Sequence, residues 1–299
     1  MKATVTSIPP AVIERSSVSV FADLIKVRLT ALVLITTLVG FYAGSSGQMD
    51  YWKMLHTILG TALLACGASA LNQLLEKELD AKMRRTENRP LPSGRLSEES
   101  VLVLGVALSA VGLIYLAVGA NVLTSFLGAV TLVSYVFIYT PLKRVTTLNT
   151  LIGAVPGALP PLMGWTGATN HVSAAGWSLF AILFLWQLPH FMAIAWLYRE
   201  DYARAGFKML PVVDPDGRKT AAQAVCYAIG LIPVSLFPSL LNITGIIYFG
   251  GALLLGIGYL FFAIQFSREL TVERAKQLFL ASIIYLPVLL GILVLDKVK

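Results

Sequence analysis

Residues 72–90 read NQLLEKELDAKMRRTENRP and begin at the end of an apolar run over 54–75. Polar side chains recur at intervals of four residues in this stretch: Asn72, Glu76, Asp80 and Arg84. Four residues advance a helix by about 400°, so these side chains share one helical face. The stretch therefore predicts a membrane helix whose polar end carries an ordered row of functional groups.

The two acids of this row are like charges one turn apart, which destabilises an ordinary surface helix by a few tenths of a kcal/mol. A divalent cation between Glu76 and Asp80 would make this pair of charges favourable instead. Mg²⁺ takes one or two carboxylates and fills its other positions with water and phosphate oxygens. Arginines, which suit phosphate binding, follow at 84, 85 and 89. The stretch indicates a metal–diphosphate site. Its plainer alternative is a solvated helix end whose charges pair with each other.

The composition of the chain is that of a membrane protein. Of 299 residues, 57% are hydrophobic and 13% charged, whereas soluble domains carry about 25% charged residues. Six segments contain no Asp, Glu, Lys or Arg: 29–49, 54–75, 102–142, 145–198, 220–267 and 277–295. Since a spanning helix needs about 20 apolar residues, the three longer segments hold two spans each. We expect an all-α polytopic fold of nine transmembrane helices around a central cavity.

The basic residues lie almost entirely on one side of this predicted topology. Twenty of the 23 Lys and Arg fall in the N-terminal arm and in the loops that follow even-numbered spans. The positive-inside rule makes that side cytoplasmic, with the C-terminus outside. This placement accounts for the net charge of +7 without a nucleic-acid partner. We expect residues 1–22 to form a flexible arm and 23–296 a single transmembrane domain.

A second polar loop, at 199–219, follows span six as the first loop, 81–99, follows span two. It opens with the acids Glu200 and Asp201 and continues with basic residues. Two such clusters facing each other would hold one diphosphate through two metal ions. Loops of this length are usually functional, and we expect the first loop to fold back over the site.

Polar residues within membrane spans are costly and indicate function. Asn149 lies in span five, and Gln187 and His190 lie in span six. His190 is a candidate iron ligand or proton donor; the commoner role of a lone histidine is a hydrogen bond to a neighbour such as Gln187. Cys66 and Cys226 lie in separate predicted spans without CxxC spacing, which argues against a disulfide or zinc site.

Four separated motifs in this chain resemble those of the intramembrane aromatic prenyltransferase superfamily, and in particular its protoheme IX farnesyltransferase branch. The first is Asn72-x3-Glu76-x3-Asp80, continued by Met83-x-Arg85-Thr86-x2-Arg89-Pro90-Leu91. The others are Asn149-x2-Ile152-Gly153-x2-Pro156, Trp186-Gln187-x-Pro189-His190-Phe191 and Asp201-Tyr202-x2-Ala205-Gly206. The similarity runs from about residue 23 to the last span.

The resemblance implies a transferase that uses Mg²⁺ and moves a farnesyl group from farnesyl diphosphate to a vinyl group of haem b, giving haem O for terminal oxidases. It implies the following roles: catalytic and metal-binding residues Asn72, Glu76, Asp80 and Asp201, with Glu200 as a further metal candidate; diphosphate-binding residues Lys26, Arg28, Arg85, Arg89, Lys143 and Arg144; and haem-pocket residues Asn149, Gln187 and His190. It places the protein in a bacterial plasma membrane, with haem-handling or oxidase-assembly proteins as partners.

This chain departs from the family pattern in both acidic motifs. Glu76 stands where an aspartate is usual, and Tyr198 and Tyr202 replace the usual pair of aspartates in the second motif. Two other functions stay open. One is prenylation of an aromatic quinone precursor, and the other is transport of a small solute or of haem. Transporters usually place charges near the membrane midplane, whereas these acids lie at helix ends.

Overall fold

The computed structural model describes residues 16–298, and the regular structure within that range is helical apart from one isolated bridge between Thr244 and Lys297. The first half of the chain contains α1 (Ser17–Leu24), α2 (Val27–Gly44), α3 (Tyr51–Asp80), α4 (Glu98–Gly119), α5 (Val122–Val133), the π-helix η1 (Ser134–Tyr139) and α6 (Thr140–Leu142). The second half contains α7 (Asn149–Thr169), α8 (Ala174–Leu197), α9 (Arg199–Ala205), α10 (Leu210–Val213), α11 (Arg218–Leu240), α12 (Ile246–Arg268) and α13 (Val272–Leu295).

Within residues 16–298, eight helices are long and apolar enough to cross a membrane. The predicted count of nine is therefore not confirmed. The difference lies in α7, the predicted fifth span, which is 21 residues long but contains Pro156, Pro160 and Pro161 together with several glycines and threonines. These residues lower the mean hydropathy of α7 although most of its side chains are buried among other helices.

The close packing of α2 against α7 explains the glycines of both helices. A Cβ atom on Gly40 would lie 2.0 Å from the main-chain oxygen of Pro161, and one on Gly164 would lie 1.9 Å from that of Thr37. Small residues let helix backbones approach each other in membranes, where packing rather than the hydrophobic effect drives association. α7 is thereby fixed near the centre of the molecule.

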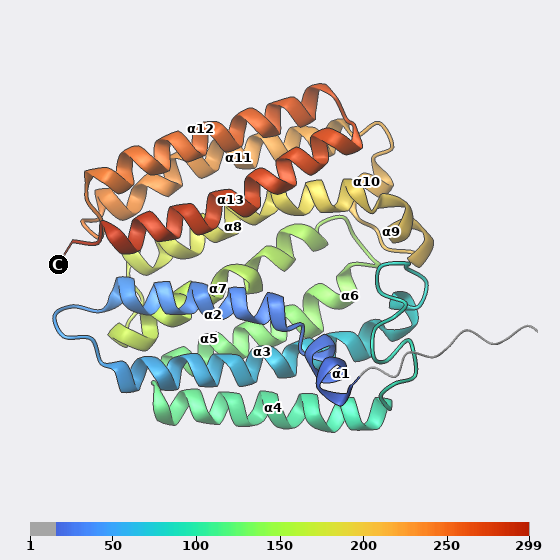
Figure 1. Ribbon diagram of the computed structural model, residues 1–299, viewed down its shortest axis with the longest axis horizontal. Coiled ribbons are helices and arrows are strands. Elements are labelled where there is room, and N and C mark those ends of the chain that lie inside the picture. The colour runs from blue at the N-terminus through green and yellow to red at the C-terminus, as the bar shows by residue number, and fades with distance from the viewer. Residues whose placement is uncertain (1–15, 299) are drawn as a thin grey trace, which may run out of the picture.

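The helices lie side by side, and the short elements gather at one end of the bundle (Figure 1). α1, α6, α9, α10 and the loop between α3 and α4 lie at this polar end, while the C-terminus marks the opposite end (Figure 1). The largest buried apolar cluster joins α8, α11, α12 and α13, and a smaller one joins α3, α4, α5 and α7. The polar end is where spans two, four and six of the prediction finish.

The predicted arm and the second polar loop contain helices that the hydropathy pattern does not reveal. Ser17–Leu24 forms α1, which belongs to the described part of the predicted arm, whereas residues 1–15 lie outside the described residues. α9 and α10 occupy much of 199–219. Each is short, and each is positioned by neighbouring helices rather than by a long apolar stripe.

Candidate functional site: a buried acid–cation cluster at the end of α3

α3 continues without a break through the motif that the sequence singles out, and it ends at Asp80. Asn72, Glu76 and Asp80 are all buried, with Asp80 only 1% exposed. Each of them contacts a different cation. The ammonium of Lys26 donates to Asn72 Oδ1 at 2.7 Å, that of Lys143 donates to Glu76 Oε1 at 2.7 Å, and Arg89 Nη1 donates to Asp80 Oδ2 at 2.6 Å. The predicted helical row is confirmed for Asn72, Glu76 and Asp80, which are surrounded by positive charge, whereas Arg84 lies beyond the end of α3.

The three cations reach the row from three separate segments. Lys26 lies in the sharp break between α1 and α2, with φ of 50° in the left-handed region. α1 is held at this break by Gln73, whose Nε2 donates to the main-chain oxygens of Asp23 and Leu24. Lys143 follows α6 directly. Such a convergence of distant segments is a property of the fold that no single sequence motif contains.

Arg89 is brought to Asp80 because the first loop folds back over the end of α3, as expected from the sequence. Thr86 Oγ1 donates to the main-chain oxygen of Asp80 at 2.9 Å. Met83 packs in an apolar cluster with Leu79, and Leu91 packs in another with Leu24. These apolar contacts hold the loop in place on both sides of Arg89.

The π-helix η1 and the adjoining α6 supply site residues that the sequence reasoning missed. Tyr135 accepts a 3.5 Å hydrogen bond from Lys26, and Thr140 Oγ1 accepts a 3.0 Å bond from Asn72 Nδ2. The Lys143 ammonium lies 4.5 Å from the centre of the Tyr139 ring, within the range of a cation–π interaction. π-helical turns are frequently found at functional sites. A visible signal was the interval of four residues from Tyr135 to Tyr139 to Lys143.

The two carboxylates of α3 have pKa values shifted in opposite directions. Burial raises the pKa of Asp80 above its usual value, and Arg89 only partly offsets this effect. Burial acts the same way on Glu76, but the charge and hydrogen bond of Lys143, with help from Lys26, outweigh it and lower the pKa of Glu76. Glu76 is therefore the more firmly ionised of the two.

The pKa values of the two lysines are also shifted in opposite directions. Desolvation, reinforced by the neighbouring charge of Arg89, lowers the pKa of Lys26 to about 7. For Lys143, burial likewise favours the neutral amine, but the carboxylate of Glu76 outweighs it and raises the pKa above the usual value. Lys143 thus stays charged, whereas Lys26 changes charge near neutral pH.

The oxygen donors of the row suit a hard divalent cation. Asp80 Oδ1 is buried and has no hydrogen-bond partner, so one carboxylate oxygen is available inside the cluster. Asn72 and Glu76 contribute the amide and carboxylate oxygens that such ions prefer. Among the described residues, no group of three or more His, Cys, Asp or Glu side chains comes close enough to hold a metal ion. The fit therefore rests on two carboxylates and one amide.

The second acidic cluster lies on α9. Asp201 forms an ion pair with Arg204 at 3.3 Å within the helix, and Glu200 is exposed. The two polar loops nevertheless meet. Arg85 Nη2 donates to the Tyr202 hydroxyl at 3.3 Å, and its guanidinium lies 5.1 Å from the centre of the Tyr198 ring. The tyrosines that replace the usual aspartates thus hold the first loop against the second.

The remaining predicted diphosphate ligands are less closely placed. Arg28 lies in the first turn of α2 and Arg144 follows Lys143, and both side chains are exposed. Neither is joined to Asn72, Glu76 or Asp80 by the contacts that hold the cluster. The role implied for these two arginines stays a prediction.

The three residues predicted for the acceptor pocket do not face one another. Gln187 Nε2 donates to the main-chain oxygen of Ala154 on α7 at 2.7 Å, whereas His190 Nδ1 is 2.6 Å from Ser282 Oγ on α13 and its ring stacks on Trp186 and Phe279. Asn149 donates to main-chain oxygens near the second loop. Their joint role in binding haem stays a prediction.

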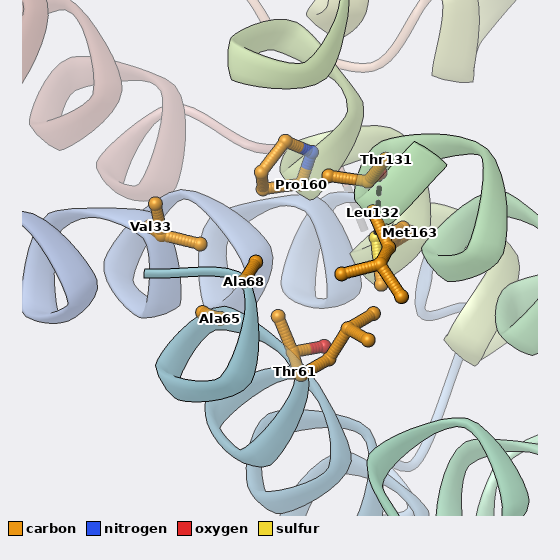
Figure 2. A pocket seen from close by; sticks show the side chains of 9 residues that line it. Val33, Thr61, Ala65, Ala68, Thr131, Leu132, Pro160 and Met163 are labelled. Carbon is orange, nitrogen blue, oxygen red and sulfur yellow. Dashed lines mark hydrogen bonds between the residues drawn. The ribbon is translucent and has the colours of Figure 1, made fainter. Parts of the chain in front are cut away.

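An apolar cavity of about 30 Å³ lies between α2, α3, α5 and α7. Figure 2 shows side chains of α3 facing Pro160 and Met163 of α7 across it. The lining consists of Val33, Thr61, Leu64, Ala65, Ala68, Thr131, Leu132, Pro160 and Met163. On α3 these residues lie one to three turns N-terminal to Asn72. At least one helical turn therefore separates the cavity from the acid–cation cluster.

Comparisons with known proteins identify the family of this chain. Residues 33–285 match the model of the UbiA prenyltransferase family. A protoheme IX farnesyltransferase from Solibacter usitatus is 49% identical over 286 residues, covering 93% of this chain and 98% of its own. One from Salinibacter ruber is 46% identical, covering 91% and 96%.

Solved structures share the fold at low sequence identity. A structure of digeranylgeranylglyceryl phosphate synthase is 18% identical, with a TM-score of 0.80 over 93% of this chain and 98% of the other. A UbiA homologue from Archaeoglobus fulgidus bound to DMAPP and Mg²⁺ is 15% identical, with a TM-score of 0.61 over 91% and 99%. With the helical membrane fold, the acid–cation cluster and the family match in agreement, this chain is an intramembrane transferase that belongs to the UbiA prenyltransferase family.

Proposed function

We propose that this protein transfers the farnesyl group of farnesyl diphosphate to a vinyl group of haem b, giving haem O. The identity of 49% to a curated protoheme IX farnesyltransferase, over nearly the whole of both chains, supports this acceptor. The observation that carries the proposal is the buried cluster in which Asn72, Glu76 and Asp80 contact Lys26, Lys143 and Arg89.

Mg²⁺ is the cofactor we propose, with Asn72, Glu76 and Asp80 as its ligands and Asp201 and Glu200 as candidates from the second loop. When bound, it neutralises the diphosphate and makes it a better leaving group. The same ion is bound with DMAPP in the Archaeoglobus fulgidus homologue.

The cations of the site stabilise the charge that develops on the leaving diphosphate. Lys143 and Arg89 reach the acids from two directions at 2.7 and 2.6 Å, and Lys26 lies beside Asn72. Fixed charges stabilise a transition state most effectively where water is excluded, as it is around these buried side chains. We expect the exposed Arg85, Arg28 and Arg144 to attract the anionic substrate from outside the cluster.

We propose that the farnesyl chain lies between α2, α3, α5 and α7, along the apolar cavity. This cavity has about the volume of one water molecule, so the four helices must move apart to admit the chain. Thr61, at the far end of the cavity, precedes Asn72 by 11 residues, or about 16 Å along the helix axis. A farnesyl chain has roughly twelve carbons in line, which span about 15 Å when bonds of about 1.5 Å are extended. The length of the chain thus matches the distance from the polar cluster to the end of the cavity.

The proposed reaction begins as the bond between C1 of the farnesyl group and the diphosphate oxygen breaks, and its electron pair leaves with the diphosphate. C1 then bonds to the terminal carbon of the haem vinyl group. Water adds to the other vinyl carbon and releases a proton, which leaves a hydroxyethylfarnesyl substituent.

The acid–cation cluster separates this proposal from only one of its two alternatives. An aromatic quinone precursor would use the same diphosphate cluster, so only the acceptor distinguishes the two. A transporter would not need a charged cluster at a helix end that suits a leaving diphosphate. We further propose a bacterial plasma-membrane location with the polar end cytoplasmic, and haem-handling or oxidase-assembly proteins as partners.

The acceptor is tested by incubating the purified protein with Mg²⁺, farnesyl diphosphate and an equimolar mixture of haem b and 4-hydroxybenzoate. We expect mass spectrometry to detect haem carrying a hydroxyethylfarnesyl group and no prenylated benzoate. Prenylated 4-hydroxybenzoate with unchanged haem would assign the other acceptor, and the absence of any product would favour transport.

A further inference from the structure

Asn149, the first residue of α7, is fully buried and holds two segments together. Its Nδ2 donates to the main-chain oxygen of Thr146 at 2.6 Å and to that of Lys208 at 3.0 Å. An amide nitrogen has two hydrogens, so both donors are used. Its Oδ1 accepts a 3.1 Å bond from Thr150. The side chain is therefore engaged within the protein.

The peptide of Lys208 is the link between Asn149 and the diphosphate site. Its oxygen accepts from Asn149, and its N–H donates to the main-chain oxygen of Lys143 at 2.7 Å. Asn149 is thus joined through one residue of the second loop to the main chain of the lysine that contacts Glu76. No sequence pattern reveals this connection, because Lys208 lies far along the chain from both Lys143 and Asn149.

The side chain of Phe207, which precedes Lys208 in the chain, also lies close to the Lys143 ammonium. Phe207 is buried, and the centre of its ring lies 5.7 Å from the Lys143 ammonium. The Tyr139 ring lies 4.5 Å from the same ammonium. A shift of residues 207 and 208 would therefore alter both the backbone position of Lys143 and the aromatic surroundings of its charge.

We propose that Asn149 is a positioning residue for diphosphate binding, which acts on Lys143 through the main chain of Lys208. This inference rests on the proposed function of the acid–cation cluster. It assigns Asn149 to the diphosphate half of the reaction rather than to the haem pocket.

A double-mutant cycle tests the link, with inorganic diphosphate in saturating Mg²⁺ as the probe and isothermal titration as the readout. Asn149→Ala removes the bridge, and we expect affinity to fall roughly tenfold, as for the loss of a buried hydrogen bond near a charge. In a Lys143→Ala background the same change should lower affinity by less than about twofold, because residues that act through one another are not additive.

Two further variants separate positioning from general damage. Asn121→Ala removes a comparable amide, which donates to the main-chain oxygen of Thr166 at 2.8 Å far from Lys143, and it should leave diphosphate affinity unchanged. Asn149→Asp keeps the shape but places an oxygen opposite the Lys208 carbonyl, so it should reproduce the loss even if the alanine variant folds poorly. Steady-state kinetics should show a raised KM for farnesyl diphosphate and an unchanged KM for haem b.

Additive losses in the cycle, or a raised KM for haem b with normal diphosphate affinity, would overturn the inference while leaving the proposed function intact. If the wild-type protein does not bind diphosphate in Mg²⁺, the proposed function fails, and the inference fails with it.

Discussion

Glu76 and Asp80 lie one helical turn apart, yet their roles differ because their partners differ. Lys143 lowers the pKa of Glu76, whereas burial raises that of Asp80 despite Arg89. Asp80 also retains the unpartnered Oδ1 atom. At the scale of single residues, Asp80 is therefore the carboxylate of the row more in need of a cation, because its charge is less compensated than that of Glu76.

Replacing Asp80 with Asn tests this need. The change keeps the shape and relieves a charge that burial disfavours, so we expect thermal stability in EDTA to equal or slightly exceed that of the wild type. Turnover should fall by about two or more orders of magnitude, roughly 3 kcal/mol of transition-state stabilisation. The Mg²⁺ concentration for half-maximal rate should rise.

Glu98→Gln is the matched control, because Glu98 forms an exposed ion pair with Lys77 at 2.6 Å. Exposed pairs contribute little, so this variant should behave as the wild type. Normal turnover and Mg²⁺ dependence in Asp80→Asn would contradict the assignment of Asp80 as a metal ligand.

Lys26 predicts a pH dependence of diphosphate binding. Its pKa of about 7 means that its positive charge is present below pH 7 and lost as pH rises through that value. Diphosphate affinity should therefore fall above pH 7, by at most about tenfold per pH unit. Lys26→Arg keeps its charge and should remove this fall. The ratio of the two affinities, measured by titration from pH 6 to 9, should widen with pH, and a constant ratio would refute the role of Lys26.

Sequence spacing predicted the α3 row, because a four-residue interval on a helix defines a face, whereas Lys26 and Lys143 were expected near it only from the family resemblance. Spacing could not predict Tyr135, Thr140 or the link through Lys208. Those contacts depend on a π-helical turn and on a loop from a distant part of the chain. Hydropathy has no means of detecting either.

At the scale of helices, the hydropathy pattern identifies the spans that face lipid but fails for a span that other helices enclose. The three longer charge-free segments, each predicted to hold two spans, are each divided by a helix break, at the ends of α4, α7 and α11. α7 is the exception in hydropathy, because its neighbours select for close approach rather than for apolarity. Its Gly164 and Pro161 backbones contact α2.

Met163 on α7 should limit the length of the prenyl chain, because it lines the cavity that we assign to the farnesyl tail and is only 1% exposed. Met163→Ala should deepen the cavity and raise kcat/KM for geranylgeranyl diphosphate relative to farnesyl diphosphate. The loss of buried contacts should also lower stability by about 2–5 kcal/mol.

Met192→Ala is the control for this prediction, since Met192 is equally buried but belongs to the cluster around α8 and α13. It should lower stability without changing chain-length preference. Competition assays with both diphosphates provide the measurement. An unchanged preference in Met163→Ala would place the farnesyl chain elsewhere.

At the scale of the whole molecule, twenty of the 23 Lys and Arg fall on the predicted cytoplasmic side, and the described acid–cation cluster lies at the end where the polar loops gather (Figure 1). In a variant with Cys66 and Cys226 replaced by Ala, Glu87→Cys and Asp216→Cys should react with an impermeant maleimide only from the cytoplasm. Ser46→Cys, in the loop at the opposite end, should react only from outside. The reverse pattern would overturn the proposed orientation.

The most direct test of the whole account couples the two halves of the reaction in one measurement. Diphosphate release and prenylated haem are quantified together, for wild-type protein in nanodiscs with farnesyl diphosphate and haem b, over a titration of Mg²⁺. We predict one diphosphate released per haem product, with both abolished by EDTA and restored by Mg²⁺. Haem prenylation that proceeds undiminished in EDTA, or diphosphate release without a haem product, would contradict the account.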